Sequence, residues 1–331
     1  MAEQLAIVGP TASGKSAVAM SFARRRIAAG SAAEIVSCDS MQVYRGMDIG
    51  TAKPSLADRA EVPHHMIDLV EPSVDHDLPQ FLASARGALA GVGARGSAAL
   101  LVGGTGLYVR ALVDGFDPPP HFPEIAAELE ASGDTQVLSD RLELLDPVAL
   151  SRIPPGNRRR IVRALEVCIG TGKRFSEHGG DFGSYPPSRI ALFGLLPARE
   201  AMTESIDRRL EDQMARGFLE EVRELAGAPG GLSRNASQAL GYRDLLEHLR
   251  GSCDLASAVA SSKVRTRRFA LRQLRWFSRD PRIVWLEPPR GGERTPEDVA
   301  QEIEAHLAKP GAGVDPAGSS FAPSGPEPWR P

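Results

Sequence analysis

A glycine-rich segment near the N-terminus, IVGPTASGKSAV (residues 7–18), has residue types and a spacing suited to binding phosphate. It fits the pattern G-x-x-x-x-G-K-[ST], with Gly9, Gly14, Lys15 and Ser16 at the fixed positions. In such a loop the backbone N–H groups point at an anion, and the lysine and the following helix N-terminus add positive charge. We therefore expect the loop to bind a di- or triphosphate. The loop residues are Gly9, Pro10, Thr11, Ala12, Ser13, Gly14, Lys15 and Ser16.

Two further polar residues follow apolar runs and could act beside this loop. Asp39 lies at the end of the run of residues 34–40, where its carboxylate could ligate Mg²⁺, act as a general base or only cap a loop. Thr105 lies in the turn GGTG, where its hydroxyl could contact a phosphate or a base. The run before Thr105 lacks the terminal aspartate that hydrolytic P-loop enzymes use for magnesium and water. Asp39 is therefore the best-placed carboxylate.

Two segments concentrate arginine. The segment NRRRIVRALE (residues 157–166) holds four, and a second set recurs at three- and four-residue steps in residues 254–279. The second set is Arg265, Arg268, Arg272, Arg275 and Arg279. Helical spacing would make it one basic stripe, with Trp276 and Phe277 fixing the other side of the helix. Such a stripe suits a phosphate backbone, although a solvated helix face is the common alternative.

A long polar loop and a histidine pair carry weaker signals. Residues 39–54, DSMQVYRGMDIGTAKP, form a loop of a length typical of substrate covers or surface excursions. The segment PHHMID (residues 63–68) contains two adjacent histidines. Neighbouring side chains tend to point in different directions, so we expect no metal site there.

Apolar runs alternate with helical patterns over most of the chain. The runs cover residues 4–8, 34–40, 98–108, 190–196 and 284–287, and helical patterns cover residues 16–29, 203–225, 254–279 and a last segment ending near Ala308. This alternation is typical of an α/β fold with a mostly parallel sheet and its chemistry at the carboxyl ends of the strands. We predict a P-loop-containing nucleotide-hydrolase-like core.

Composition shifts predict the domain boundaries. Prolines interrupt residues 114–123, and the chain up to about residue 189 is helical in character. We therefore predict a core of residues 1–116 and 190–308 with a helical insertion domain of residues 117–189. Residues 309–331 are rich in proline, glycine and serine and are expected to be disordered.

Bulk composition limits the setting. The 331 residues carry a formal net charge of −3, so any nucleic-acid binding must come from local patches. Three widely spaced cysteines, Cys38, Cys168 and Cys253, fit a reducing cytosol rather than a disulfide framework. No apolar run approaches the roughly 20 residues of a membrane helix, and we expect a cytoplasmic protein.

Seven segments occur in the order seen in bacterial tRNA dimethylallyltransferases (tRNA isopentenyltransferases), and the chain resembles that family over residues 5 to about 287. They are GPTASGKS, DSMQVYRGMDIGTAKP, PHHMID, LLVGGTGLY, NRRRIVRALEV, GYRD and TRRFALRQLRWF. The resemblance implies transfer of a dimethylallyl group from dimethylallyl diphosphate to the exocyclic N6 of the adenine 3′ of the anticodon in a subset of tRNAs. The loop would then hold a diphosphate leaving group, with neither phosphoryl transfer nor hydrolysis.

The resemblance also implies roles for single residues. Asp39 would be the general base, Thr105 would also be catalytic, and Arg209, or the adjacent Arg208, would face the diphosphate. Mg²⁺ would bind at Ser16. Residues implied to contact the anticodon stem-loop are Asp39, Ser40, Met41, Gln42, Thr105, Arg159, Arg160, Ile161, Val162, Arg163, Gln238, Gly241, Tyr242, Arg243, Arg268 and Arg272. The insertion and the C-terminal helices would clamp the stem-loop, and the family suggests a monomer.

Some positions depart from the family pattern, and other functions stay open. Ala126 stands near a frequent arginine, Gln213 where methionine is common, and Leu271 and Arg275 where lysine and threonine are usual; these could tune tRNA affinity. An enzyme prenylating free adenine nucleotides and a small-molecule kinase would share the loop, but the basic segments count against both. A non-catalytic RNA-binding relic would not need intact Lys15, Ser16, Asp39 and Thr105.

Overall fold

The computed structural model describes residues 4–178 and 184–309 and contains a six-stranded sheet in the order β3-β2-β4-β1-β5-β6. All paired neighbours run parallel. The strands are β1 (Gln4–Val8), β2 (Ala33–Ser37), β3 (His64–His65), β4 (Ala98–Gly103), β5 (Ala191–Leu195) and β6 (Ile283–Leu286). The predicted α/β class with a mostly parallel sheet is confirmed.

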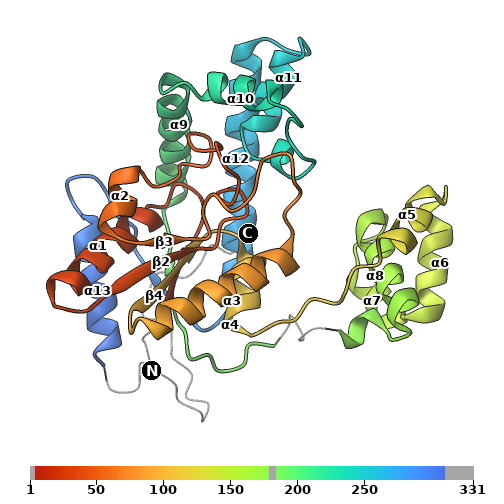
Figure 1. Ribbon diagram of the computed structural model, residues 1–331, viewed down its shortest axis with the longest axis horizontal. Helices are drawn as coiled ribbons and strands as arrows, with labels where there is room; N and C mark the ends of the chain where they lie inside the picture. Colours follow the sequence, from red (N-terminus) through yellow and green to blue (C-terminus); the bar gives the residue numbers. More distant parts are fainter. Residues whose placement is uncertain (1–3, 179–183, 310–331) are drawn as a thin grey trace. The chain divides into compact units, whose positions relative to one another are not determined.

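Strand alternation explains how the sheet forms its core. Side chains at alternate positions of a strand face opposite sides of a sheet. Leu5 and Ile7 of β1 and Leu100 and Val102 of β4 join one buried cluster with α1 (Lys15–Ala28) and α13 (Pro296–Leu307). The intervening positions face the side on which α3 (Leu78–Ala94) and α4 (Gly106–Val113) pack together (Figure 1). The phosphate loop and the ends of β2 and β4 are therefore carried by a rigid sheet.

The chain divides into two compact units. The core unit comprises the residues up to Gly115 and from Tyr185 onward, and the insertion unit comprises Phe116–Ser184. Further helices of the core unit are α2 (Leu56–Glu61), α9 (Arg199–Ala215), α10 (Phe218–Gly227), the short η2 (Ala236–Gln238), α11 (Tyr242–Leu249) and α12 (Leu255–Phe277).

The insertion unit has a hydrophobic core of its own. Its helices are α5 (Pro123–Ala131), α6 (Thr135–Leu145), α7 (Pro147–Arg152), α8 (Arg158–Thr171) and the short η1 (Phe175–Glu177). Leu138 and Leu142 of α6 pack with Ile161 and Leu165 of α8. Buried Asp146 caps α7 by accepting from Ala149 N at 2.9 Å, and it also accepts from Ser176 N at 2.7 Å.

The strand ends differ in part from the predicted ones. The second strand, predicted over residues 34–40, ends at Ser37, so Asp39 lies beyond it. The third strand, predicted to run into a glycine turn within residues 98–108, ends at Gly103, before α4 starts at Gly106. The histidine pair, to which the sequence analysis assigned no secondary structure, forms β3 beside β2. His65 Nε2 lies 2.6 Å from Glu34 Oε2, which explains the pair by local packing. Of the segment 309–331, for which we predicted disorder, residues 310–331 lie outside the described residues.

Among the described residues, no helix combines the length and the apolarity needed to cross a bilayer.

Candidate active site

The glycine-rich loop connects β1 to α1 and has the backbone shape that its glycines predict. Gly14 caps α1 with φ +85°, and Gly9 has φ +144°. A Cβ atom at Gly9 would lie 2.9 Å from the carbonyl oxygen of Leu195, so a larger residue would meet backbone. The N–H groups of the loop and the N-terminus of α1 therefore point toward the same position, where they can bind an anion.

Two cationic side chains meet at this loop. Lys15 Nζ donates to Pro10 O at 2.5 Å, and Arg209 Nη1 donates to Thr11 Oγ1 at 3.2 Å. Burial, and then the positive charge of Arg209, lower the pKa of Lys15 to about 7, although the charge of Asp39 acts in the opposite direction. Burial also lowers the pKa of Arg209. Of the two arginines considered from the sequence, Arg209 reaches the loop and Arg208 is exposed. Two desolvated cations beside a phosphate loop form a site for a multivalent anion.

Asp39 and Thr105 meet next to the loop because β2 and β4 are neighbours in the sheet. Asp39 Oδ1 accepts from Met41 N at 2.9 Å, and Thr105 Oγ1 accepts from Ser40 N at 3.2 Å. The two turns lie so close that a Cβ atom at Gly103 would be 2.2 Å from Cys38 O. The close approach places a carboxylate and a hydroxyl together at the carboxyl ends of the strands.

Gln273 of α12 is a site residue that the sequence analysis did not single out. Its Oε1 accepts from Thr11 N at 2.8 Å, and its Nε2 donates to Gly104 O at 2.9 Å. The side chain is buried, and it connects the phosphate loop with the turn that carries Thr105. The only available signal was a polar residue on the apolar face of a helix.

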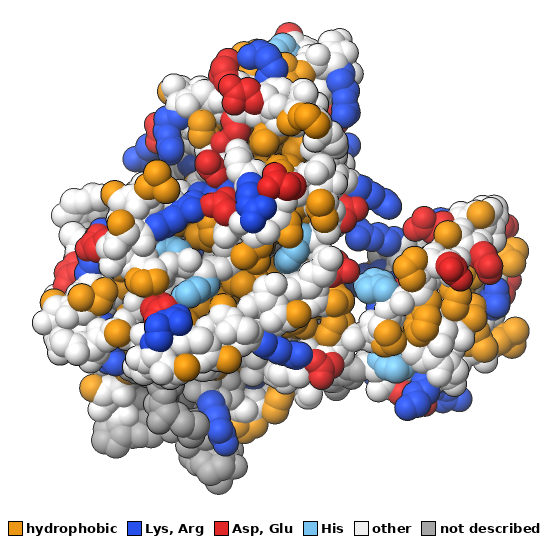
Figure 2. Space-filling view, in the orientation of Figure 1, with side chains coloured by type: hydrophobic (Ala, Val, Ile, Leu, Met, Phe, Trp, Pro, Cys, Tyr) orange, Lys and Arg blue, Asp and Glu red, His pale blue; other side chains and the backbone are white. Residues whose placement is uncertain are grey.

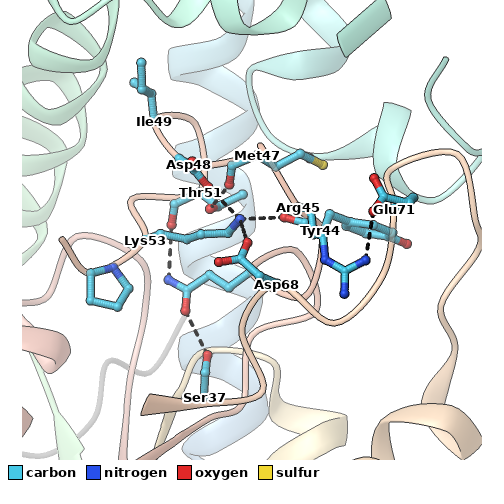
Figure 3. A network of polar contacts seen from close by, with 12 residues as sticks. Ser37, Tyr44, Arg45, Met47, Asp48, Ile49, Thr51, Lys53, Asp68 and Glu71 are labelled. Atoms are coloured by element: carbon cyan, nitrogen blue, oxygen red, sulfur yellow. Dashed lines mark hydrogen bonds and ion pairs between the residues drawn. The ribbon is translucent and has the colours of Figure 1, made fainter. Parts of the chain in front are cut away.

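The loop of residues 39–54 packs against the core unit instead of forming a surface excursion. Val43, Tyr44 and Met47 are fully buried among α9, α10 and α11. Lys53 Nζ donates to Tyr44 O at 2.5 Å and to Asp68 Oδ1 at 2.5 Å, and it is drawn at the centre of this network in Figure 3. Of the two alternatives, the surface excursion is wrong, and residues 39–54, called the wall loop below, form a packed wall of the site.

Side chains from α9, α10 and α11 hold the middle of this loop. Glu221 accepts from the backbone N–H groups of residues 48, 49 and 50 at 2.9, 2.6 and 3.1 Å, and from the Tyr242 hydroxyl at 2.5 Å. Gln213 Nε2 donates to Ile49 O at 2.7 Å and to Gly50 O at 2.9 Å. Gln213 is buried, so the suggested effect of this departure on tRNA affinity would act through the loop.

A cavity of about 1040 Å³ joins these groups within the core unit. Its walls include the phosphate loop from Thr11 to Ser16, the residues Asp39, Thr105, Arg209 and Gln273, and the wall loop around Thr51. The cavity is at the upper end of the volumes typical of small-molecule sites, about 300–1,000 Å³. It brings together all three residues that were predicted to be catalytic, Asp39, Thr105 and Arg209.

The residues of the core unit predicted to contact tRNA fall into two groups. Ser40, Met41, Gln42, Gln238 and Arg272 line the cavity, and Arg243 and Arg268 are exposed. Tyr242 also lines the cavity, although its side chain is buried and its hydroxyl donates to Glu221. A Cβ atom at Gly241 would be 2.5 Å from the Phe218 ring. Gly241 and Tyr242 therefore have packing roles, and their contact with tRNA stays a prediction. The Gln42 amide is also bonded inward, accepting from Ser37 Oγ at 2.8 Å.

The insertion unit shows a similar division. Arg159 and Arg160 are exposed at the start of α8, whereas Ile161 and Val162 are buried in the unit's core. Arg163 donates to Pro119 O at 2.6 Å and pairs with Glu166 at 2.8 Å. The side chains of Ile161 and Val162 therefore serve packing, and contact of this segment with tRNA stays a prediction.

The basic stripe predicted for α12 is shorter than expected. Arg265 pairs with buried Asp244 at 2.9 Å, and Arg279 lies beyond the end of the helix. Arg268, Arg272 and Arg275 are exposed. Elsewhere on the face drawn in Figure 2, acidic and basic side chains are interspersed, in line with the small net charge. Any strong electropositive contact of α12 therefore rests on the C-terminal half of the helix, where these three arginines lie.

Comparison with known proteins decides the family. A family model described as IPP transferase matches residues 42–280. This chain belongs to that family. It is 41% identical over 305 residues, 90% of this chain and 98% of the other, to a tRNA dimethylallyltransferase from Anaeromyxobacter dehalogenans. A relative of the same name from Geobacter metallireducens is 43% identical over 289 residues, 86% of this chain and 92% of the other.

Solved structures agree with the IPP transferase family. The full-length tRNA isopentenylpyrophosphate transferase from Bacillus halodurans has a TM-score of 0.66 and 33% identity, covering 92% of this chain and 96% of that one. A eukaryotic dimethylallyltransferase studied while acting on tRNA has a TM-score of 0.73 and 25% identity, covering 87% and 74%. The resemblance described from the sequence is confirmed, and the chain is a prenyltransferase of the tRNA-modifying family.

Proposed function

We propose that this IPP transferase moves the dimethylallyl group of dimethylallyl diphosphate to N6 of the adenine 3′ of the anticodon in a subset of tRNAs. One observation carries the proposal. Lys15, Arg209 and the phosphate loop face the same cavity as Asp39 and Thr105. One cavity thus contains a diphosphate site and a carboxylate that can remove a proton. An alkyl transfer from a diphosphate to an amine requires both.

The leaving group is stabilised by preorganised positive charge. Breaking the allylic C–O bond leaves the electron pair on the diphosphate, where negative charge grows. The ammonium of Lys15, the guanidinium of Arg209 and the loop N–H groups are in place before the reaction, so they favour this charge without reorganising. Because both cations are desolvated in the free protein, a bound diphosphate supplies the anion that they lack.

Asp39 acts as the general base. The exocyclic amine of adenine is a poor nucleophile because its lone pair is delocalised into the ring, so N6 loses a proton as the C–N bond forms. The Met41 N–H fixes one carboxylate oxygen of Asp39. Thr105, fixed by Ser40 N, positions the adenine or a phosphate oxygen beside it. The proton of N6 passes to Asp39, and diphosphate leaves with the bonding electrons.

The donor set fits a magnesium ion held together with substrate. Mg²⁺ is commonly bound by one or two protein oxygen ligands, several waters and substrate phosphates. Ser16 lies at the exposed start of α1 and Asp39 lines the same cavity, so both could contribute an oxygen ligand. No cluster of three or more acidic, histidine or cysteine side chains in residues 4–178 and 184–309 could hold a metal alone. The ion would supply further positive charge at the leaving diphosphate.

Recognition of tRNA uses the exposed arginines of both units. Arg268 and Arg272 on α12 and Arg159 and Arg160 on α8 are free to meet backbone phosphates. The adenine must leave the stacked anticodon loop to reach Asp39, as in other enzymes that modify bases. We infer that Ser40, Met41 and Gln42 line the route taken by the base.

The test is prenyl transfer with labelled dimethylallyl diphosphate and Mg²⁺. Acceptors are an unmodified anticodon stem-loop with adenine 3′ of the anticodon, the same stem-loop with guanine at that position, and AMP. Label in the adenine stem-loop alone supports the proposal. Label in AMP alone would assign the chain to nucleotide prenylation. No transfer, with phosphoryl transfer from ATP instead, would identify a kinase.

A further inference from the structure

The buried Gln273 side chain joins two parts of the active site that are 169 residues apart in the sequence. One end of its amide accepts the N–H of Thr11, and the other end donates to the carbonyl of Gly104. The Thr11 hydroxyl in turn accepts from Arg209, and Gly104 precedes Thr105. Gln273 therefore bonds Thr11, which contacts Arg209, and Gly104, which precedes Thr105. It does not itself contact Arg209 or Thr105 through these bonds.

The glycines of the GGTG turn make room for this contact. A Cβ atom at Gly104 would lie 2.2 Å from Gln273 Nε2, and a Cβ atom at Gly106 would lie 2.1 Å from Trp276 Cδ1. These two α12 residues are one helical turn apart and face the same turn after β4. The sequence patterns GGTG and RQLRW are thus two halves of one packing contact.

We propose that Gln273 is a positioning residue that sets the distance between the diphosphate loop and the Thr105 turn. Its identity is dictated by the two partners, one a donor and the other an acceptor. A neutral amide of this length satisfies both, whereas a carboxylate would oppose the Gly104 carbonyl and an aliphatic chain would satisfy neither. The identification of the bound ligand as a prenyl diphosphate depends on the proposed function.

A second consequence concerns how the diphosphate is held. Because the Thr11 N–H is bonded to Gln273, it is not available to the anion. The diphosphate is bound by the N–H groups that follow, from Ala12 to Ser16, and by Lys15 and Arg209. Removing Gln273 frees the Thr11 N–H and lets the start of the loop move, so the geometry for leaving-group departure is lost while the tRNA-facing arginines stay in place.

The experiment compares Gln273→Leu and Gln273→Glu in the full-length chain. We measure calorimetric binding of inorganic pyrophosphate with Mg²⁺, binding of the anticodon stem-loop, and kcat and KM for dimethylallyl diphosphate. Both variants are expected to weaken pyrophosphate binding and to lower kcat/KM by about 10- to 100-fold, since a misplacement of about 1 Å has effects of that order. Gln273→Glu is expected to be the weaker pyrophosphate binder because it adds negative charge. Stem-loop binding is expected to stay near that of the wild type, because the exposed arginines of α12 are unchanged.

The matched control is Asp146→Leu, which also removes a buried side chain that bonds backbone groups of two segments, but in the insertion unit. It is expected to lower the melting temperature without weakening pyrophosphate binding. The proposal is overturned if the Gln273 variants keep wild-type pyrophosphate affinity and kcat/KM, or lose only stability. If the wild type binds pyrophosphate but prenylates no acceptor, the proposed function fails while the comparison of pyrophosphate affinities still decides the role of Gln273.

Discussion

Asp39 illustrates how a single residue can be interpreted from its place after a strand. Replacing it by asparagine keeps the shape and the bond from Met41 N but removes the basic oxygen. We expect kcat to fall on the order of 10²- to 10⁴-fold, as for other general bases, with stem-loop binding unchanged. Single-turnover transfer and stem-loop titration measure the two effects. Asp48→Asn, an exposed carboxylate in the same loop, serves as control, and an active Asp39→Asn enzyme would remove the base assignment.

Lys15 predicts the pH dependence of diphosphate binding. Its pKa is about 7 in the free protein, and a bound diphosphate stabilises the ammonium and raises that pKa. Below pH 7 the ammonium is already present, whereas above pH 7 binding must take up a proton. The affinity for dimethylallyl diphosphate is therefore expected to fall with rising pH, by up to about tenfold per unit. Calorimetry at pH 8 in two buffers of different ionisation enthalpy measures the uptake. A flat affinity from pH 7 to 9, or no change in slope in Lys15→Met, would refute this.

At the scale of elements, Glu221 controls the wall loop. Its carboxylate accepts from three consecutive backbone N–H groups and from the Tyr242 hydroxyl, so the loop is held by charge-assisted bonds. We expect Glu221→Gln to lower the free energy of unfolding by about 1.5–3 kcal/mol and to raise KM for the stem-loop. Urea unfolding with an unchanged m-value measures the first effect. Glu220→Gln, an exposed neighbour paired with Arg223, should leave both quantities near wild type.

Elements could be predicted where one local pattern decided them. The glycine spacing predicted the phosphate loop, and apolar runs located β1, β5 and β6, since both signals lie within a few residues. The β3 strand could not be predicted, because two residues gain strand geometry only by pairing with β2. The sequence could not decide between a substrate cover and a surface excursion for the wall loop for a similar reason. Its packing depends on Glu221 and Gln213, which are more than 160 residues away in the sequence.

At the scale of the whole molecule, the site is assembled from segments that the sequence keeps apart. The cavity is lined from residues 11–16, from 39–42, from 103–105 and from helices α9 and α12. The order of the motifs identified the family. The family resemblance then implied that Arg209 faces the diphosphate and that tRNA is the acceptor. The bridging role of Gln273, the inward direction of Ile161 and Val162, and the pairing of Arg265 with Asp244 depend on tertiary packing. The spacing of arginines along a helix does not show which of them is exposed to solvent and which, like Arg265, pairs with a buried aspartate.

The insertion unit gives the last prediction, because its exposed arginines lie in a unit separate from the diphosphate site. Arg159→Ala combined with Arg160→Ala is expected to raise KM for tRNA without changing KM for dimethylallyl diphosphate. If both side chains meet phosphates, the slope of log K for tRNA against log salt becomes shallower by about 1.4–1.8. Arg141→Ala, which removes an exposed arginine of α6, is the control for a general loss of charge.

The neighbouring variant Arg158→Ala should act differently, by lowering stability, because Arg158 donates to Glu130 O at 3.0 Å and to Leu129 O at 3.2 Å at the end of α5. An unchanged salt slope in the variant that lacks both Arg159 and Arg160 would mean that tRNA is held by the core unit alone.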